Sequence, residues 1–276
     1  MFIPYSDDNP AEKTPYATVG LIVLNVAMLF YVGGMNDDNQ RRFVATHGFI
    51  PARLHQLNTG QVVPINIYPD AQWLAQQDIA VPQDRAIVFS PDRWGTYGAM
   101  ITSMFLHGGM LHLLGNMWFL WLFGPNIEDR LGHGWFLFFY LLGGWTATMC
   151  HTYFSPAPAM FVPVVGASGA VATVLGAYAV TFPKANVRTL LFLGFFFTVF
   201  EIPALIVLGV WFAGQVLNGL GNPGSNSGVA WWAHVGGFVF GAALMPLVGG
   251  SPTRLPVGGV ADAAAPMPEI ENNRTN

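Results

Sequence analysis

Charged residues are scarce in this sequence. Asp, Glu, Lys and Arg together make up 9% of its 276 residues, against about 25% in ordinary soluble proteins. Hydrophobic residues make up 53% of the chain, and its mean hydropathy is +0.43. This number of charged residues is too small to cover a water-facing surface. The composition therefore excludes an ordinary soluble globule, a disordered chain and a collagen-like chain. We therefore interpret the chain as a membrane protein that is embedded in a lipid bilayer.

Cysteine and an excess of positive charge are also missing. The one cysteine, Cys150, excludes an internal disulfide and any metal site built from cysteines. The formal net charge of −4 provides no basic field, so nucleic acid is not an expected partner. The histidines show no metal-ligand spacing such as H-E-x-x-H, and we expect neither a metal ion nor another cofactor.

Uncharged apolar runs divide the sequence into six expected membrane spans. At about 1.5 Å per residue, a helix needs about 20 apolar residues to cross a hydrocarbon core about 30 Å thick. Prolines near 155–158 and at 163 divide the longest uncharged stretch into two spans, and the Gly, Asn and Ser residues of 218–228 divide another. The expected spans are 17–32, 111–124, 134–153, 167–182, 202–217 and 232–248.

The remaining segments complete the expected organisation. It consists of a cytoplasmic N-terminal segment (1–16), a membrane domain of six helices (17–250) and a flexible C-terminal tail (251–276). A long external loop, 33–96, follows the first span, and 71–77 within it are expected to form a short helix at the membrane interface. The apolar run 189–200 is too short to cross, so we expect an interfacial or re-entrant piece there.

The basic residues indicate the orientation of the chain. If the N-terminus is cytoplasmic, the short outer segments 154–166 and 218–231 hold no Lys or Arg. The inner segments then hold Lys13, Arg130, Lys184, Arg188, Arg254 and Arg274. Lys and Arg in short loops favour the cytoplasmic side of a membrane. We therefore expect a multi-pass protein of the bacterial inner (cell) membrane with both termini in the cytoplasm.

Four polar side chains lie at corresponding ends of three spans. Ionisable and amide side chains are energetically expensive within a membrane and therefore indicate function by default. His112 and Asn116 lie one helical turn apart near the start of the second span. Ser168 opens the fourth span and His234 opens the sixth. These three spans all run from outside to inside, so we expect the four side chains at similar depth near the outer membrane face.

Small residues on the fourth and sixth spans favour close contact between them. On the fourth span, Ser168, Ala172 and Gly176 recur every four residues. On the sixth span, Gly237 and Gly241 follow the histidine. Small residues on facing helices let two backbones approach closely in lipid. If these faces pack together, the serine and the histidine meet at the shared end of the two spans.

A serine beside a histidine has the chemistry of a nucleophile with its general base. The hydroxyl of Ser168 is a weak nucleophile until a base removes its proton during attack, and the imidazole of His234 can accept that proton at neutral pH. The tetrahedral intermediate then needs hydrogen-bond donors for its oxyanion. The Asn116 amide, the His112 ring and the Ser168 backbone N–H are the candidate donors.

No carboxylate is expected at the depth of this site. Glu128 and Asp129 follow the second span on the inner side, and Glu201 begins the fifth span at the inner face, opposite Ser168. The sequence therefore predicts a dyad rather than a triad. Packing or a hydroxyl, and not a carboxylate, is expected to orient His234.

Four separated motifs resemble those of the rhomboid intramembrane serine proteases. They are His107-Gly-Gly-Met-Leu-His112-Leu-Leu-Gly-Asn116, Glu128-Asp-Arg130-Leu-Gly132, Gly166-Ala-Ser168-Gly169 and Ala233-His234-x-x-Gly237-x-x-x-Gly241. They stand in the family's order and cover roughly 102–248, which is more than half of the chain. The resemblance implies an all-α membrane protein with a six-helix rhomboid-like bundle. It also implies cleavage of transmembrane segments near the outer membrane face, with single-pass membrane proteins as substrates.

The resemblance assigns a role to each motif residue. It implies that Ser168 is the nucleophile and His234 the general base, and that His112 and Asn116 form the oxyanion site with the backbone N–H of the serine. The other motif residues are implied to be structural, namely His107, Glu128, Arg130, Gly166, Gly169, Gly237 and Gly241.

The chain departs from the family's pattern at two places. Many members carry a Trp-Arg pair a few residues before the first motif, where this chain has Gly98-Ala99, with Trp94 slightly earlier. Some members place a tyrosine four residues after the nucleophile, against the base, where this chain has Ala172. The anchoring of the long loop and the group that orients the histidine are therefore open at this point.

Two other functions are compatible with such a sequence. A catalytically silent relative that binds membrane clients would share the fold, but such relatives usually lose the Ser or the His, and this chain keeps both. A small-solute transporter with a polar site at mid-membrane would more often show internal repeats and broken helices. The sequence shows neither feature, so a serine endopeptidase is the favoured interpretation.

Overall fold

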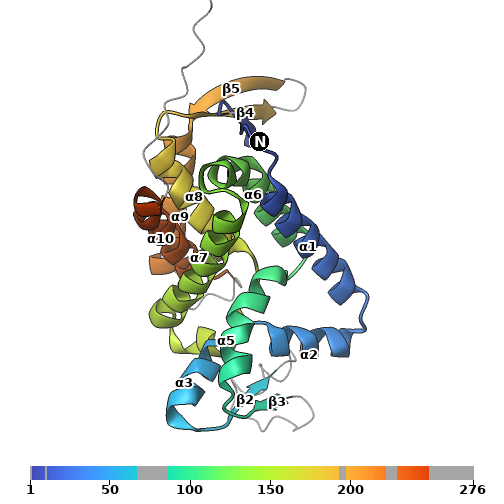
Figure 1. Ribbon diagram of the computed structural model, residues 1–276. Helices are drawn as coiled ribbons and strands as arrows, with labels where there is room; N and C mark the ends of the chain where they lie inside the picture. Colours follow the sequence, from blue (N-terminus) through green and yellow to red (C-terminus); the bar gives the residue numbers. More distant parts are fainter. Residues whose placement is uncertain (1, 10, 67–85, 193–196, 222–228, 249–276) are drawn as a thin grey trace, which may run out of the picture.

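A computed structural model of the protein describes residues 2–9, 11–66, 86–192, 197–221 and 229–248 (Figure 1). Six long helices in this part of the chain overlap the six apolar runs of the sequence. They are α1 Tyr16–Gly33, α6 Met110–Leu131, α7 His133–Phe154, α8 Ser168–Thr181, α9 Ala204–Gly221 and α10 Trp231–Val248. Among the described helices, α1, α9 and α10 are long and apolar enough to cross a membrane by length and composition.

Helix α8 lies at the centre of the bundle. Eleven of its 14 residues are buried, and it packs against α10, α7 and α6. A Cβ atom added to Gly241 of α10 would lie 1.9 Å from the Thr173 carbonyl oxygen, and one on Gly237 would lie 2.2 Å from the Gly169 carbonyl oxygen. Only glycine permits an approach this close, which brings the start of α10 beside the start of α8.

The face of α8 that meets α10 includes residues beyond the expected row. The expected row is Ser168, Ala172 and Gly176, and its first and last members do contact α10. Gly169 and Thr173 contact α10 as well. These residues lie on one side of α8 because an α-helix has 3.6 residues per turn. The close contact between the two helices is as expected, and the contacting face is wider than the expected row.

Helix α6 continues past the expected end of the second span. The sequence placed that end at Pro125, but the helix includes the proline and runs to Leu131. A proline removes one backbone donor, and neighbouring helices can compensate for the loss. In the last two turns, the buried carboxylate of Glu128 accepts hydrogen bonds from the backbone N–H groups of Ala17 at 2.8 Å and Thr18 at 2.7 Å. The end of α6 is thereby joined to the start of α1.

A three-stranded antiparallel sheet lies beyond this end of the bundle (Figure 1). Its strands are β1 Phe2–Asp7, β4 Asn186–Phe192 and β5 Phe197–Pro203, in the order β1-β4-β5. The sequence predicted an interfacial or re-entrant piece over 189–200. The described residues of this run instead belong to two paired strands. Val, Thr, Leu and Phe in this run favour a strand, and pairing with β1 satisfies the backbone donors and acceptors of β4. Glu201, expected to begin the fifth span, lies in β5.

The region after the first span is folded rather than a plain loop. It contains α2 Asp37–His47, α3 Pro51–Thr59, β2 Val63–Asn66, β3 Ala86–Phe89 and the start of α5 Arg93–Thr102. The sequence carried signals for two of these helices. Asn36 accepts a hydrogen bond from Asn39 N–H at the start of α2, and Asp92 accepts one from Gly95 N–H at the start of α5. The expected helix at 71–77 lies outside the described residues, as does the tail 251–276.

A buried arginine lies within the module formed by α2, α3 and α5. Trp94 is 90% exposed, whereas Arg53 of α3 is 4% exposed. The Arg53 guanidinium lies 4.3 Å above the centre of the Phe89 ring, which is a favourable cation–π arrangement. Burial lowers the pKa of Arg53, while the nearby carboxylate of Asp92 acts in the opposite direction. Two short 3-10 helices, Ser103–Phe105 and Ala157–Phe161, complete the described elements.

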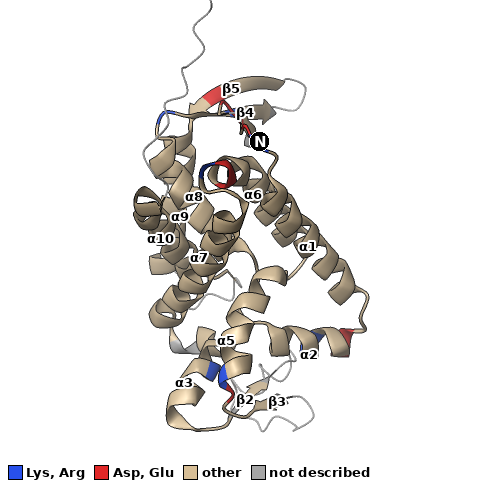
Figure 2. Ribbon diagram, in the orientation of Figure 1, with Lys and Arg blue, Asp and Glu red and all other residues tan. Residues whose placement is uncertain are grey.

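Charged residues lie at the two ends of the described molecule (Figure 2). At one end they lie on β5 and the last turns of α6, and at the other end on α2, α3 and α5. The helical region between the two ends shows none in this view. This distribution is typical of a protein whose middle lies in hydrocarbon, where charges are expensive. The fold is thus mostly helical, with two small sheets that an all-α class does not include.

Candidate active site

The start of α8 places a hydroxyl within the bundle. The 14 residues of α8 span about 21 Å, whereas the hydrocarbon core of a bilayer is about 30 Å thick. If the last residue of α8 lies at one surface of the core, the first residue lies well below the other surface. That first residue is Ser168, and its side chain is half-buried.

His234 in the first turn of α10 contacts this hydroxyl. Its Nε2 atom lies 2.8 Å from Oγ of Ser168, although the two residues are 66 positions apart in the sequence. Gly237, about one turn beyond His234, lies close to the carbonyl of Gly169, the residue after Ser168, and this contact keeps the two side chains together. The structure thus brings together the serine and the histidine that the sequence analysis paired.

An amide that the sequence analysis missed lies on the other side of the histidine. Oε1 of Gln215, on α9, is 2.7 Å from Nδ1 of His234. The Gln215 Nε2 group donates to the backbone carbonyl of Trp211, one turn earlier, at 3.3 Å. A signal for this residue was present, because Gln215 is an amide within the uncharged run 202–217. The sequence predicted packing or a hydroxyl as the group that orients the histidine, and the structure adds a carboxamide at hydrogen-bond distance from Nδ1 to the aromatic rings packed against it.

An aromatic ring from α9 packs against His234. The centre of the Trp211 ring lies 5.9 Å from that of His234, and the Trp231 ring approaches at 6.2 Å with its plane nearly perpendicular. Ala172, at the position where some family members carry a tyrosine, is wholly buried. Here α9 supplies the aromatic neighbour of the histidine, and α8 supplies a small residue.

The candidate oxyanion donors lie beside the loop that leads into α8. Asn116 is buried, and its Nδ2 atom is 3.0 Å from Nε2 of His107. If the amide uses one N–H for this hydrogen bond, its second N–H remains available to another acceptor. The ring of His112 packs edge to face with that of His107 at 5.2 Å, and His112 is exposed. His107 therefore supports both candidate donors.

Gly166 joins these donors to the serine. Its φ of +124° is one that side chains rarely allow, and its N–H donates to the Ser103 carbonyl at 2.9 Å. A Cβ atom at this position would lie 2.7 Å from Cε1 of His112 and 3.7 Å from Nδ2 of Asn116. The backbone two residues before Ser168 thus lies directly against the candidate donors.

The remaining motif residues lie in packing or helix-end positions. A Cβ atom on Gly169 would be 2.7 Å from Cβ of Ala147, on α7. Glu128 also lies 2.5 Å from Nδ1 of His133. Arg130 lies in the last turn of α6, where positive charge is favourable to the helix dipole. In the described residues, no group of three or more His, Cys, Asp or Glu side chains could hold a metal ion.

A second serine–histidine contact shows that proximity alone does not define a nucleophile. Ser155 Oγ lies 3.0 Å from Nδ1 of His151, at the end of α7. These residues are one turn apart on a single chain segment, so local helix geometry suffices to bring them together. Ser168 and His234 differ because separate helices bring them together. An amide of α9 contacts the histidine, and the candidate donors of α6 lie against the loop before the serine.

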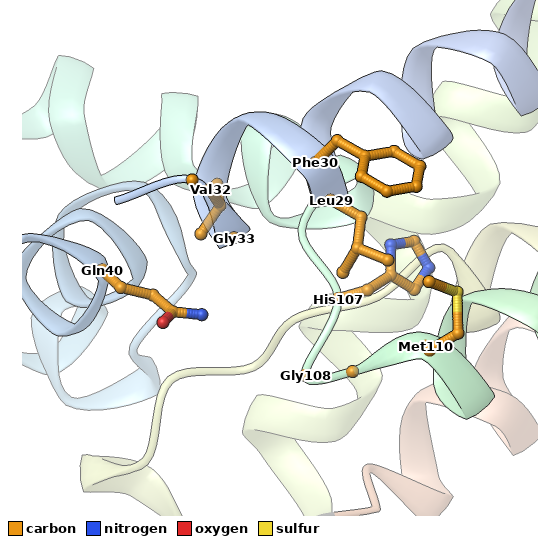
Figure 3. A pocket seen from close by; sticks show the side chains of 10 residues that line it. Leu29, Phe30, Val32, Gly33, Gln40, His107, Gly108 and Met110 are labelled. Carbon is orange, nitrogen blue, oxygen red and sulfur yellow. The ribbon is translucent and has the colours of Figure 1, made fainter. Parts of the chain in front are cut away.

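A cavity of about 430 Å³ lies beside the oxyanion candidates (Figure 3). Leu29, Phe30 and Val32 at the end of α1 form an apolar wall, and His107 and Gln40 provide polar groups. The end of α1, Gln40 of α2 and His107 thus line one cavity. His107 is the histidine that contacts Asn116.

Comparison with known proteins identifies the family. The Rhomboid domain matches residues 94–251, which is more than half of the chain. The chain belongs to the rhomboid family. Together with its apolar helices, membership makes this rhomboid a membrane protein.

Several proteins named as rhomboid proteases or rhomboid-like proteins are similar in sequence. Presenilin-associated rhomboid-like protein A, mitochondrial, of Danio rerio is 34% identical over 149 residues, which are 51% of this chain and 35% of that protein. Rhomboid protease GluP of Bacillus subtilis (strain 168) is 33% identical over 165 residues, or 58% of this chain and 29% of that protein. RHOMBOID-like protein 6, mitochondrial, of Arabidopsis thaliana is 25% identical over 166 residues, or 60% and 51%. The matched region thus spans about a third of the first two relatives.

Proposed function

We propose that this rhomboid is a serine endopeptidase that cleaves transmembrane segments of single-pass membrane proteins near the outer membrane face. The contact of 2.8 Å between Nε2 of His234 and Oγ of Ser168 is the observation that carries this proposal. The position of Asn116 and His112 against the loop before the serine supports it. The similarity to a relative named as a rhomboid protease supports the same class of reaction.

The first half of the proposed reaction forms an acyl-enzyme. Oγ of Ser168 attacks the carbonyl carbon of the scissile peptide bond while Nε2 of His234 accepts the hydroxyl proton. The carbonyl oxygen becomes an oxyanion, and the Asn116 amide, the His112 ring and the Ser168 backbone N–H are the proposed donors to it. The C–N bond then breaks, and the imidazolium returns its proton to the leaving amine.

The second half of the reaction releases the new carboxyl terminus. A water molecule attacks the ester carbonyl while Nε2 of His234 accepts one of its protons. The second tetrahedral intermediate uses the same donors, and its collapse returns the proton to Oγ of Ser168. Removing one oxyanion donor from a serine protease typically lowers the rate by about 10²–10³-fold, so loss of the Asn116 amide should have an effect of that size.

The proposal includes a topology for the chain. The six long helices form the six spans, both termini lie in the cytoplasm, and the membrane is the inner (cell) membrane of a bacterium. The absence of Lys and Arg from 154–166 and 218–231 supports this orientation. Under this topology the outer module of α2, α3 and α5 lies on the same side of the membrane as the starts of α6, α8 and α10.

The substrate class follows from the access that attack requires. A peptide bond inside a regular helix is hydrogen-bonded and shielded by side chains, so its carbonyl carbon is inaccessible to the serine. We therefore expect substrates whose transmembrane helix loosens near the outer interface.

Co-expression with a tagged single-pass test substrate tests the proposal. Wild type should release a fragment, whereas Ser168→Ala and His234→Ala should not. Ser155→Ala is the matched control, because it removes the other serine that lies beside a histidine, and it should cleave like wild type. Equal cleavage by wild type and Ser168→Ala would overturn the proposal.

Labelling with a fluorophosphonate probe separates the enzyme from a silent client-binding rhomboid. An activated Ser168 should react in wild type and in Ser155→Ala, but not in Ser168→Ala. Equal labelling of all three proteins would count against an activated serine and would favour the client-binding function.

A further inference from the structure

The Gln215 amide on α9 is a side-chain hydrogen-bond partner of His234 that the proposed reaction does not use. We propose that Gln215 is a positioning residue that sets the tautomer and the ring direction of His234, so that α9 completes the site with a neutral carboxamide. This inference rests on the proposed peptidase function, because it assigns a partner to the base of that reaction.

The hydrogen bonds of Gln215 determine which way its amide faces. Its side chain lies between the Trp211 carbonyl, 3.3 Å from Nε2, and Nδ1 of His234, 2.7 Å from Oε1. A carbonyl can only accept, so the NH₂ group must face Trp211 and the amide oxygen must face the imidazole. The opposite orientation would place two oxygens against each other in a residue that is 9% exposed.

The direction of the amide in turn determines the position of the imidazole proton. An amide oxygen accepts but cannot donate, so Nδ1 of His234 must carry the proton. Nε2 is then left with its lone pair directed at the Ser168 hydroxyl, 2.8 Å away. The other tautomer would present an N–H to the serine and could not accept its proton. In serine proteases with a triad, a buried aspartate has this function, and its replacement by asparagine lowers kcat by about 10⁴-fold because the wrong tautomer is selected.

A carboxamide suits this position better than a carboxylate. The site lies among apolar helices, where an ionised group is expensive. Gln215 supplies an acceptor without adding a charge to the resting bundle. The amide dipole can still stabilise the imidazolium that forms during attack, although less strongly than a full negative charge would.

The spacing of residues on α9 makes the contact possible. Trp211 and Gln215 are one helical turn apart and therefore lie on the same face. The tryptophan ring covers His234 at 5.9 Å while the amide bonds its Nδ1 atom. The imidazole is thus held by a ring and an amide from α9 and by the hydroxyl from α8. The other titratable groups that act on it in the described structure are His112 of α6 and His151 of α7.

Two substitutions at this position separate the acceptor from the shape of the side chain. Gln215→Met keeps a side chain of similar length but removes the acceptor, and Gln215→Glu keeps an acceptor and adds a charge. Asn218→Leu is the matched control, because this amide lies on the same helix and donates to the Gly214 carbonyl at 2.7 Å. All variants are compared in the full-length protein for thermal unfolding and for cleavage of the test substrate.

We expect the loss of the Gln215 amide to change kcat rather than KM. Gln215→Met should lower kcat by about 10–100-fold with KM within about twofold of wild type, since a buried Nδ1–H without a partner disfavours the productive tautomer. Gln215→Glu should retain more activity, and the acid limb of its pH–kcat profile should move to higher pH because a carboxylate stabilises the imidazolium. Asn218→Leu should keep wild-type kcat and an unshifted profile. A merely structural role for Gln215 would not move the pH profile.

Different experimental results would overturn this inference and the proposed peptidase function. If Gln215→Met keeps the kcat of Asn218→Leu, the positioning role is overturned and the peptidase proposal stands. If Ser168→Ala cleaves as well as wild type, the peptidase proposal fails, and ¹⁵N NMR of the imidazole, assigned by comparison with His234→Ala, still decides the tautomer. A proton on Nδ1 in wild type that is lost or mixed in Gln215→Met supports the inference. A proton on Nε2 in wild type overturns it.

Discussion

At Gly166 the backbone is left-handed and lies against the candidate oxyanion donors. Its φ is +124°, and a Cβ atom there would lie 2.7 and 2.8 Å from two ring atoms of His112. An alanine at this position would both strain the backbone and displace the imidazole of His112. Hydrogen-bond donors must be positioned within a few tenths of an ångström to stabilise a developing charge.

We therefore expect Gly166→Ala to lower the rate of substrate cleavage by about 10²-fold or more. Gly115→Ala is the matched control, because a Cβ on this neighbour of Asn116 meets no other atom within 4 Å, and alanine favours a helix. Initial rates of test-substrate cleavage by the two variants provide the measurement. Wild-type rates in Gly166→Ala would contradict the proposed location of the oxyanion site.

The side chain of Asp7 connects strand β1 to helices α6 and α8. From β1 it accepts hydrogen bonds from the Tyr178 hydroxyl of α8 at 2.5 Å and from the Asn126 amide of α6 at 2.8 Å. Burial raises the pKa of Asp7 above its ordinary value of 3.8, and the hydrogen bond from Tyr178 only partly opposes this. The strand is therefore attached to the bundle that carries the site through a carboxyl group that resists ionisation.

The raised pKa of Asp7 predicts how the attachment of β1 depends on pH. Its contribution to stability is fully present below the ordinary pKa and decreases as the pH rises through the raised value, because the carboxylate must then be buried in charged form. Asp7→Asn keeps a carbonyl acceptor and should remove this dependence. Hydrogen exchange of the β1 amides between about pH 4 and pH 8, corrected for the intrinsic rate, measures the effect.

The matched control for Asp7→Asn is Glu201→Gln, which changes an exposed carboxylate of the same sheet that pairs with Arg188 at 3.2 Å. An exposed ion pair contributes little to stability, so this variant should keep the wild-type dependence on pH. If Asp7→Asn also keeps the wild-type pH dependence of hydrogen exchange in β1, a group other than Asp7 must cause that dependence.

The molecule as a whole separates its charges into two ends, and the proposed topology assigns one end to each side of the membrane. Single cysteines test this in a Cys150→Ala background, because Cys150 is the only native cysteine. Thr59→Cys lies exposed on α3 in the outer module, and Lys184→Cys lies exposed between α8 and β4.

A membrane-impermeant maleimide should label Thr59→Cys in intact cells, and Lys184→Cys only after the membrane is disrupted. Labelling with the reverse accessibility would show that the chain has the opposite orientation. Labelling of both in intact cells would show that the two positions lie on the same side, which six spans and this connectivity do not allow.

The approximate position of each long helix was predictable because the cost of placing a residue in a membrane depends mainly on that residue. The third expected span, 134–153, lies within α7, His133–Phe154, for this reason. The pairing of Ser168 with His234 also followed from sequence, because parallel spans place their first residues at one depth. The small residues on the fourth and sixth spans supported the same pairing.

The tertiary structure decided the features that depend on contacts between distant segments. The run 189–200 could not be recognised as strands because β4 pairs with residues 2–7, far away in the sequence. The contact of Gln215 with His234 depends on the rotation of α9, and a helix that is apolar on nearly all faces carries no pattern that sets its rotation. The free-energy cost of each residue in the membrane depends on that residue alone, so the sequence determines the depth of each span. The rotation of the helices and the pairing of the strands depend on packing between surfaces that only the folded chain brings together.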